Sequence, residues 1–194
     1  QATDLFINFI EKDFRFLNIP LKVTYSETQP YRRMKVRLKK EIISLGRKDI
    51  DPREMTGERI SPEAFKNILD RKEEVLVLDT RNEYETRVGK FENAIDLNLD
   101  TFRDFPKAVE SLPEEYKDKQ IVMYCTGGIR CEKASAVMMK AGFADVKQLD
   151  GGVIEYFKET GGAYWEGDCF VFDERVALDK ELNETEYIYC YICR

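Results

Sequence analysis

The fold is decided by the stretch Ile121-Val122-Met123-Tyr124-Cys125-Thr126-Gly127-Gly128-Ile129-Arg130-Cys131, which is followed by a helical run over residues 132–141. An apolar run typical of a β-strand delivers Cys125 to a glycine-containing turn, and the turn opens directly into a helix. The unpaired N–H groups and the positive dipole end of that helix face the sulfur. A thiol placed there beside an arginine has its pKa lowered from about 8.5 to roughly 3.5–7.5. We therefore expect Cys125 to be a nucleophilic thiolate.

Strands and helices alternate on both sides of this stretch. The apolar patterns predict strands over 75–79, 94–99, 121–125 and 146–150, and helices over 61–71, 102–112, 131–141 and 152–160. Such alternation is typical of an α/β fold with a parallel sheet covered on both faces. Ligands of these sheets bind at the carboxyl ends of the strands, which is where Cys125 lies. One more strand is expected over 169–177.

The N-terminal quarter of the chain is basic, whereas the rest is acidic. Residues 1–48 contain 11 Lys and Arg against 5 Asp and Glu, and residues 49–194 contain 20 against 32. We expect a helix over 2–17 and strands over 21–25 and 34–38. The second strand alternates apolar and basic positions, so that one face carries Arg33, Lys35, Arg37 and Lys39. This face suits contacts with RNA phosphates, although a merely solvated strand face has the same pattern.

These patterns divide the chain into four parts. They are a basic module (1–48), a polar linker (49–60), the α/β domain (61–162) and a C-terminal extension (163–194). A helix and two strands are less than a complete small α+β module, so we expect the natural protein to continue before Gln1. No apolar run approaches the roughly 20 residues that a bilayer requires, and no signal sequence is present, so a cytoplasmic protein without membrane contact is expected.

Histidine is absent and cysteine is sparse. The lack of histidine excludes a Cys-His dyad, a Ser-His-Asp triad and a two-His iron site within this chain. The five cysteines are an odd number and are read as reduced thiols. Cys190 and Cys193 make half of a zinc-ribbon site, and Cys169 alone does not complete the four ligands that zinc needs. We therefore predict no metal ion.

The loop from Cys125 to Arg130 has the spacing C-x4-R. The residues between the two ends are Thr126, Gly127, Gly128 and Ile129. Successive N–H groups in such a turn form a concave anion site, and the arginine adds a second positive charge. The loop is expected to hold a thiolate, a persulfide or a small oxyanion. A buried structural cysteine is the alternative interpretation.

Several motifs resemble those of known families. Residues 77–85, 89–95, 124–130 and 142–152 are similar, in order and spacing, to the signatures of a rhodanese domain covering about 60–162. Residues 33–37, 123–135, 152–156 and 170–175 closely resemble the bacterial rhodanese-domain tRNA uridine hydroxylases. This resemblance implies a rhodanese-like domain preceded by part of a ferredoxin-like α+β module.

The same resemblance implies a function. It implies oxygen-dependent 5-hydroxylation of the wobble uridine of tRNA, with Cys125 as the essential cysteine, tRNA and not DNA as the partner, and molecular oxygen as cosubstrate. No other cofactor is identifiable from the sequence. A sulfurtransferase that carries a persulfide on Cys125 is the alternative enzyme. A noncatalytic rhodanese domain that binds RNA or protein is the third possibility.

Three further residues are expected to support the loop. Asp79 and Arg81 end the neighbouring strand, where a charged pair could brace the loop or Arg130, although an ordinary strand-end ion pair has the same pattern. Cys131 could resolve an oxidised form of Cys125. As the first residue of a helix it could equally serve only in packing.

Overall fold

The computed structural model describes residues 2–19, 21, 23, 29, 31, 33 and 35–190. The chain forms two compact units, Gln1–Arg32 and Arg33–Arg194. None of the helices in the described ranges has the length and apolar character needed to cross a membrane.

The first unit contains the α-helix α1 (Ala2–Ile10) and the 3₁₀ helix η1 (Phe14–Phe16). The single helix predicted over 2–17 is therefore wrong beyond Ile10. Asp13 explains the break, because its carboxylate accepts a hydrogen bond from the Arg15 N–H (3.1 Å) and pairs with the Arg15 guanidinium. This interaction caps a new turn where the helix was expected to continue. The strand predicted over 21–25 lies mostly outside the described residues.

The basic segment at the start of the second unit is not a strand. Residues 35–39 have no regular secondary structure, so the strand predicted over 34–38 is wrong for its described part, while Met34 lies outside it. Val36 and Leu38 were expected to face a core and are exposed. An extended segment is stable as a strand only when neighbours pair its backbone and cover its apolar side. The four basic side chains are also exposed.

A parallel five-stranded sheet is the centre of the second unit, with the order β1-β6-β5-β2-β4. Its strands are β1 (Glu58–Ile60), β2 (Leu76–Asp79), β4 (Ile95–Asp96), β5 (Gln120–Tyr124) and β6 (Asp145–Leu149). Because β5 is the middle strand, Cys125 follows it at the centre of the edge where parallel sheets bind ligands.

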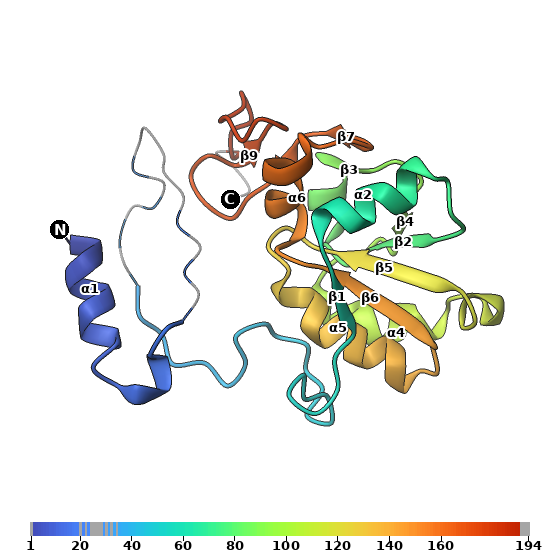
Figure 1. Ribbon diagram of the computed structural model, residues 1–194, viewed down its shortest axis with the longest axis horizontal. Helices are drawn as coiled ribbons and strands as arrows, with labels where there is room; N and C mark the ends of the chain where they lie inside the picture. The colour runs from blue at the N-terminus through green and yellow to red at the C-terminus, as the bar shows by residue number, and fades with distance from the viewer. Residues whose placement is uncertain are drawn as a thin grey trace. The chain divides into compact units, whose positions relative to one another are not determined.

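Two helices cover each face of this sheet, as Figure 1 shows. They are α2 (Pro62–Asp70) and α6 (Gly152–Thr160) on one face, and α4 (Phe105–Glu110) and α5 (Ile129–Lys140) on the other. Ile121 and Met123 of β5 belong to the core beside α4 and α5. Val122 and Tyr124 belong to the core beside α2 and α6. Alternate residues of β5 thus contribute to the two cores on opposite faces of the sheet. The predicted α/β architecture is confirmed.

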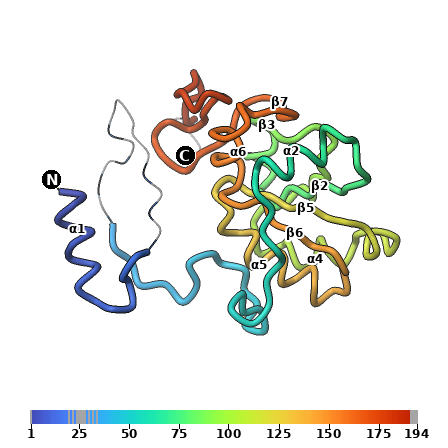
Figure 2. The backbone as a smooth tube through the Cα atoms, in the orientation of Figure 1, coloured from blue at the N-terminus to red at the C-terminus, as the bar shows by residue number. Residues whose placement is uncertain are grey.

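Smaller elements complete the unit. They are α3 (Glu83–Thr86), the 3₁₀ helices η2 (Phe102–Asp104) and η3 (Glu114–Tyr116), and the strands β3 (Gly89–Phe91) and β7 (Trp165–Gly167). The antiparallel pair of β3 and β7 lies side by side in Figure 2. The helix predicted over 102–112 is η2 followed by the shorter α4. The sequence reasoning missed α3, β3 and β7, which are too short to show a clear period.

Two further expectations are corrected. β1 lies inside the predicted linker (49–60) and pairs with β6, and Leu45 and Ile50 are buried in the core beside α4 and α5. The strand predicted over 169–177 is an antiparallel pair instead, β8 (Cys169–Phe170) and β9 (Ala177–Leu178). The chain reverses between them because the Asp173 carboxylate accepts a hydrogen bond from the Arg175 N–H (3.0 Å).

Candidate active site

Cys125 lies in the turn between β5 and α5. The residue is buried, and its Sγ accepts a hydrogen bond from the Gly128 N–H (3.1 Å). α5 begins at Ile129, so the first turn of a 12-residue helix starts beside the sulfur. The positive end of the helix and its unpaired N–H groups favour a negative charge there.

The N-terminus of α6 packs against the Cys125 loop and binds two of its carbonyl oxygens. The Val153 N–H donates to the Cys125 carbonyl (3.0 Å), and the Ile154 N–H donates to the Thr126 carbonyl (3.2 Å). Gly152 has φ +67°, and a Cβ there would lie 2.4 Å from the Cys125 carbonyl oxygen. Only a residue without a side chain permits this approach. The loop carbonyls are thereby bound on the side of α6, which leaves loop N–H groups for the sulfur.

Arg130 forms a buried ion pair with Glu85. Its two terminal nitrogens donate to the two Glu85 oxygens at 2.5 and 2.7 Å. The Thr126 hydroxyl donates to the same carboxylate (3.2 Å), and so does the Asn82 N–H (3.1 Å). Glu85 is fully buried. The loop's arginine therefore shares its charge with a carboxylate instead of presenting it freely.

Sequence reasoning missed Glu85. A local signal existed, because Asn82 and Glu85 form a capping box at the start of α3, and an N-x-x-E spacing is typical of that motif. That spacing predicts a helix start and nothing about Arg130. The pairing arises only when α3 is packed against the loop.

Asp79 and Arg81 form a second buried pair, with Nη2 of Arg81 2.7 Å from the Asp79 carboxylate. In the described part of the chain, the pair's other hydrogen bonds go to Tyr124, whose hydroxyl donates to Asp79 (2.5 Å), and to the Gly89 carbonyl (2.6 Å). The pair thus anchors the residue before Cys125. Contact with Arg130, one of the two predicted options, is not observed, because Arg130 pairs with Glu85.

Cys131 is buried beside Cys125, and its thiol lies 3.7 Å from the Thr80 hydroxyl. The pKa of Cys125 is lowered to about 6, and the hydrogen bond from Cys131 is the largest cause. The Arg130 charge and the N–H groups of Arg130 and Cys131 also lower this pKa, whereas burial raises it. Burial and the neighbouring sulfur raise the pKa of Cys131 well above its ordinary value. Cys125 is therefore the thiolate of the pair, and Cys131 is its donor.

The remaining predicted site residues are exposed and lie on the loop or on the segment before the domain. Gly127 and Ile129 are exposed on the loop, whereas Arg33, Lys35, Arg37 and Lys39 are exposed on the segment before the domain. Cys169 is buried, and burial raises its pKa to about 12. Among the described residues, no group of three or more Cys, Asp or Glu side chains is arranged to hold a metal ion; Cys193 lies outside them.

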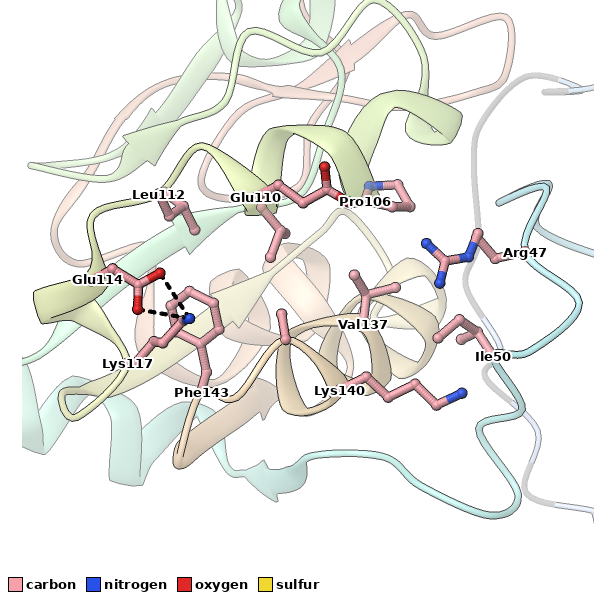
Figure 3. A pocket seen from close by; sticks show the side chains of 12 residues that line it. Arg47, Ile50, Pro106, Glu110, Leu112, Glu114, Lys117, Val137, Lys140 and Phe143 are labelled. Atoms are coloured by element: carbon pink, nitrogen blue, oxygen red, sulfur yellow. Dashed lines mark hydrogen bonds and ion pairs between the residues drawn. The ribbon is translucent and has the colours of Figure 1, made fainter.

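A cavity of about 400 Å³ lies between α4 and α5 (Figure 3). Its apolar walls include Val109, Leu112, Val137 and Phe143. Its basic rim residues are paired with carboxylates, Lys117 with Glu114 at 2.8 Å, and Arg47 and Lys140 both with Asp49. Cys125 does not line this cavity, so the reactive loop and the cavity are separate features.

Comparison with known proteins identifies the family. Residues 61–159 match the rhodanese-like domain, and residues 1–42 match the UPF0176 acylphosphatase-like domain. A tRNA uridine(34) hydroxylase of Burkholderia cenocepacia is 42% identical over 203 residues, which span all of this chain and 72% of that protein. A tRNA uridine(34) hydroxylase of Wolbachia pipientis subsp. Culex pipiens is 44% identical over 195 residues, which span all of this chain and 68% of that protein.

The chain belongs to the tRNA uridine(34) hydroxylase family. The predicted family and the predicted rhodanese-like fold are both confirmed. The solved rhodanese-like domain of an Anabaena protein aligns with a TM-score of 0.46 and 23% identity, covering 58% of this chain and 80% of that one.

The pKa of Cys125 gives a testable pH profile. Since the thiolate is the nucleophile, alkylation by iodoacetamide is expected to rise with pH, to be half-maximal near pH 6 and to level off above it. Cys131→Ala removes the donor and is expected to move the midpoint up by roughly one to two pH units, since a hydrogen bond to a charged group contributes about 1.5–3 kcal/mol. Cys131→Ser keeps a donor and is expected to stay near the wild-type midpoint. Peptide mass spectrometry measures Cys125 separately from other thiols, and equal midpoints for both variants would contradict the assignment.

Two glycines with the same backbone conformation test how α6 supports the loop. Gly152 (φ +67°) approaches the Cys125 carbonyl, whereas a methyl group added at Gly161 (φ +65°) would meet nothing within 4 Å. Gly161→Ala is expected to cost about 1–2 kcal/mol in the free energy of unfolding from backbone strain alone. Gly152→Ala is expected to cost more and also to slow Cys125 alkylation. Urea unfolding and alkylation rates measure both effects; equal behaviour of the two variants argues against the contact.

Proposed function

We propose that this chain hydroxylates the wobble uridine of tRNA at its 5-position and that Cys125 is the catalytic residue. The observation that carries the proposal is an activated, buried cysteine in a chain that matches tRNA uridine(34) hydroxylases over its whole length. Hydroxylation replaces the hydrogen on C5 with a hydroxyl group and removes two electrons from the base. We propose molecular oxygen as the source of the oxygen atom. Its second oxygen atom then leaves as water, which takes two protons and two electrons from an external two-electron reductant.

Each residue in and around the loop has a separate role in this proposal. Cys125 supplies the thiolate, and the Gly128 N–H stabilises its charge. Arg130 is fixed by Glu85 beside the sulfur, where it stabilises negative charge on sulfur or on an oxygen species. Asp79 and Arg81 position the strand end through Tyr124, and Cys131 tunes the Cys125 thiol.

The same geometry is compatible with sulfur transfer. An anion-binding loop around a thiolate also stabilises a persulfide, so the loop chemistry by itself does not separate the two reactions. Membership of the hydroxylase family favours hydroxylation, and we keep persulfide transfer as the second candidate.

We propose that the exposed basic segment binds tRNA phosphates. Arg33, Lys35, Arg37 and Lys39 are exposed, and residues 35–39 are free of regular structure. Such side chains can follow an RNA backbone without reading its sequence. A tRNA substrate also favours a cytoplasmic location for the protein.

Cys125→Ser tests the reaction. Because serine is a far weaker nucleophile at neutral pH, 5-hydroxyuridine is expected to be absent from the tRNA of cells that contain only this variant. Cys190→Ser is the matched control at an exposed cysteine and is expected to leave the modification unchanged. Nucleoside mass spectrometry is the measurement. Undiminished hydroxyuridine with Cys125→Ser refutes the proposal, and thiosulfate:cyanide turnover without any effect on hydroxyuridine favours sulfur transfer.

Replacing the four basic residues by glutamine tests the binding segment. tRNA affinity is expected to fall, and the slope of log K against log salt is expected to become shallower by about 0.7–0.9 for each phosphate that is no longer neutralised. Lys107→Gln, an exposed lysine on α4, is the control and is expected to change neither quantity. Filter binding over a salt series measures both. An unchanged salt slope in the fourfold variant would show that this segment is not part of the tRNA interface.

A further inference from the structure

Three aromatic rings form a row beside the reactive loop. The Tyr84 and Phe170 rings meet edge to face with centroids 5.3 Å apart, and the Phe170 and Phe172 rings meet in the same way at 5.2 Å. Tyr84 lies on α3, whereas Phe170 and Phe172 lie on β8 and the turn after it. The row is thus assembled from two segments that are more than 80 residues apart in the sequence.

The row is attached to the active site at both ends. Tyr84 directly precedes Glu85, the residue that pairs with Arg130. The guanidinium carbon of Arg130 lies 5.6 Å from the centre of the Phe172 ring. A cation over an aromatic face is a favourable contact, so the ring and the charge stabilise each other's position. The outer rings therefore lie next to the ion pair that closes the Cys125 loop, Phe172 at Arg130 and Tyr84 beside Glu85 in the sequence.

The outer rings of the row remain open to solvent. Tyr84 is 46% exposed, Phe172 is 57% exposed, and Ile129 of the loop itself is 56% exposed. Single exposed apolar residues are common, but a contiguous group of them beside a reactive residue marks a binding surface. The row offers flat apolar faces next to an arginine, which is the combination that proteins use to stack unpaired RNA bases.

We propose that Phe172 and Tyr84 form a stacking surface that orients a base of the tRNA anticodon loop, the target uridine at position 34, over the Cys125 loop. This inference rests on the proposed function for the identity of the base. A uracil ring is flat and uncharged, and its C5 can reach the loop only when the ring is turned out of the anticodon stack. Stacking tolerates any base. The surface therefore orients the base but does not distinguish uridine from other bases, so other contacts must select uridine.

The test compares an anticodon stem–loop RNA that has uridine at position 34 with one that is abasic there. Wild-type protein is expected to bind the uridine RNA about fivefold or more tightly, because stacking on one side chain contributes about 1–3 kcal/mol per base. Phe172→Leu and Tyr84→Leu keep apolar bulk without a ring and are expected to lose this preference. Phe172→Tyr and Tyr84→Phe keep the ring and are expected to retain it.

Two controls separate stacking from structure. Phe14→Leu, at an exposed phenylalanine of the first unit, is expected to keep the preference. The ion pair with Glu85 holds Arg130 without the ring, so Cys125 alkylation without RNA is expected to stay near the wild-type rate in Phe172→Leu. This result shows that Arg130 and the loop remain in place. Wild-type preference in both leucine variants, or no preference in the wild type, overturns the stacking surface. A preference that depends on Phe172 in a protein that forms no hydroxyuridine leaves the surface standing and refutes the hydroxylase function.

Discussion

The buried pair of Glu85 and Arg130 is the interaction on which the reactive loop depends. Two hydrogen bonds join the side chains, and the Thr126 hydroxyl and Asn82 N–H satisfy the remaining capacity of the carboxylate. Taking two charges out of water is costly, and removing one partner of such a pair typically destabilises a protein by about 3–5 kcal/mol. The pair therefore ties α3 to the turn between β5 and α5.

This pairing changes how the cysteine is activated. A C-x4-R loop suggests that the arginine lowers the thiol pKa, yet Arg130 shares its charge with Glu85. The hydrogen bond from Cys131 is the largest contribution that favours the Cys125 thiolate, and the charge of Arg130 comes after it. Like Arg130 and Glu85, Asp79 and Arg81 form an ion pair with no net charge. This second pair anchors Tyr124, the residue before Cys125. The site thus relies on short-range hydrogen bonds in a buried setting, where they are stronger than in water.

Sequence patterns predicted the regular part of the fold well. The strand before Cys125, the helix after it and the helix that begins at Pro62 all have clear periods or caps, and the structure contains them. The errors lie where a pattern needs a partner that the sequence does not reveal. The alternating residues 34–38 look like a strand but have no neighbour to pair with in their described part. Residues 58–60 end a mostly polar stretch that looks like a linker, yet they pair with β6.

The sequence by itself determined the family, the α/β alternation and the placement of Cys125 between a strand and a helix, because periodicity, turn residues and the C-x4-R spacing are local properties of the chain. Only the tertiary structure decided that Glu85 balances Arg130, that Gly152 approaches the Cys125 carbonyl, and that Tyr84 and Phe172 flank the loop. Each of these contacts joins residues far apart in the sequence, and it exists only after the sheet and its helices have packed. A local sequence pattern does not indicate which distant side chain will pack against a given residue.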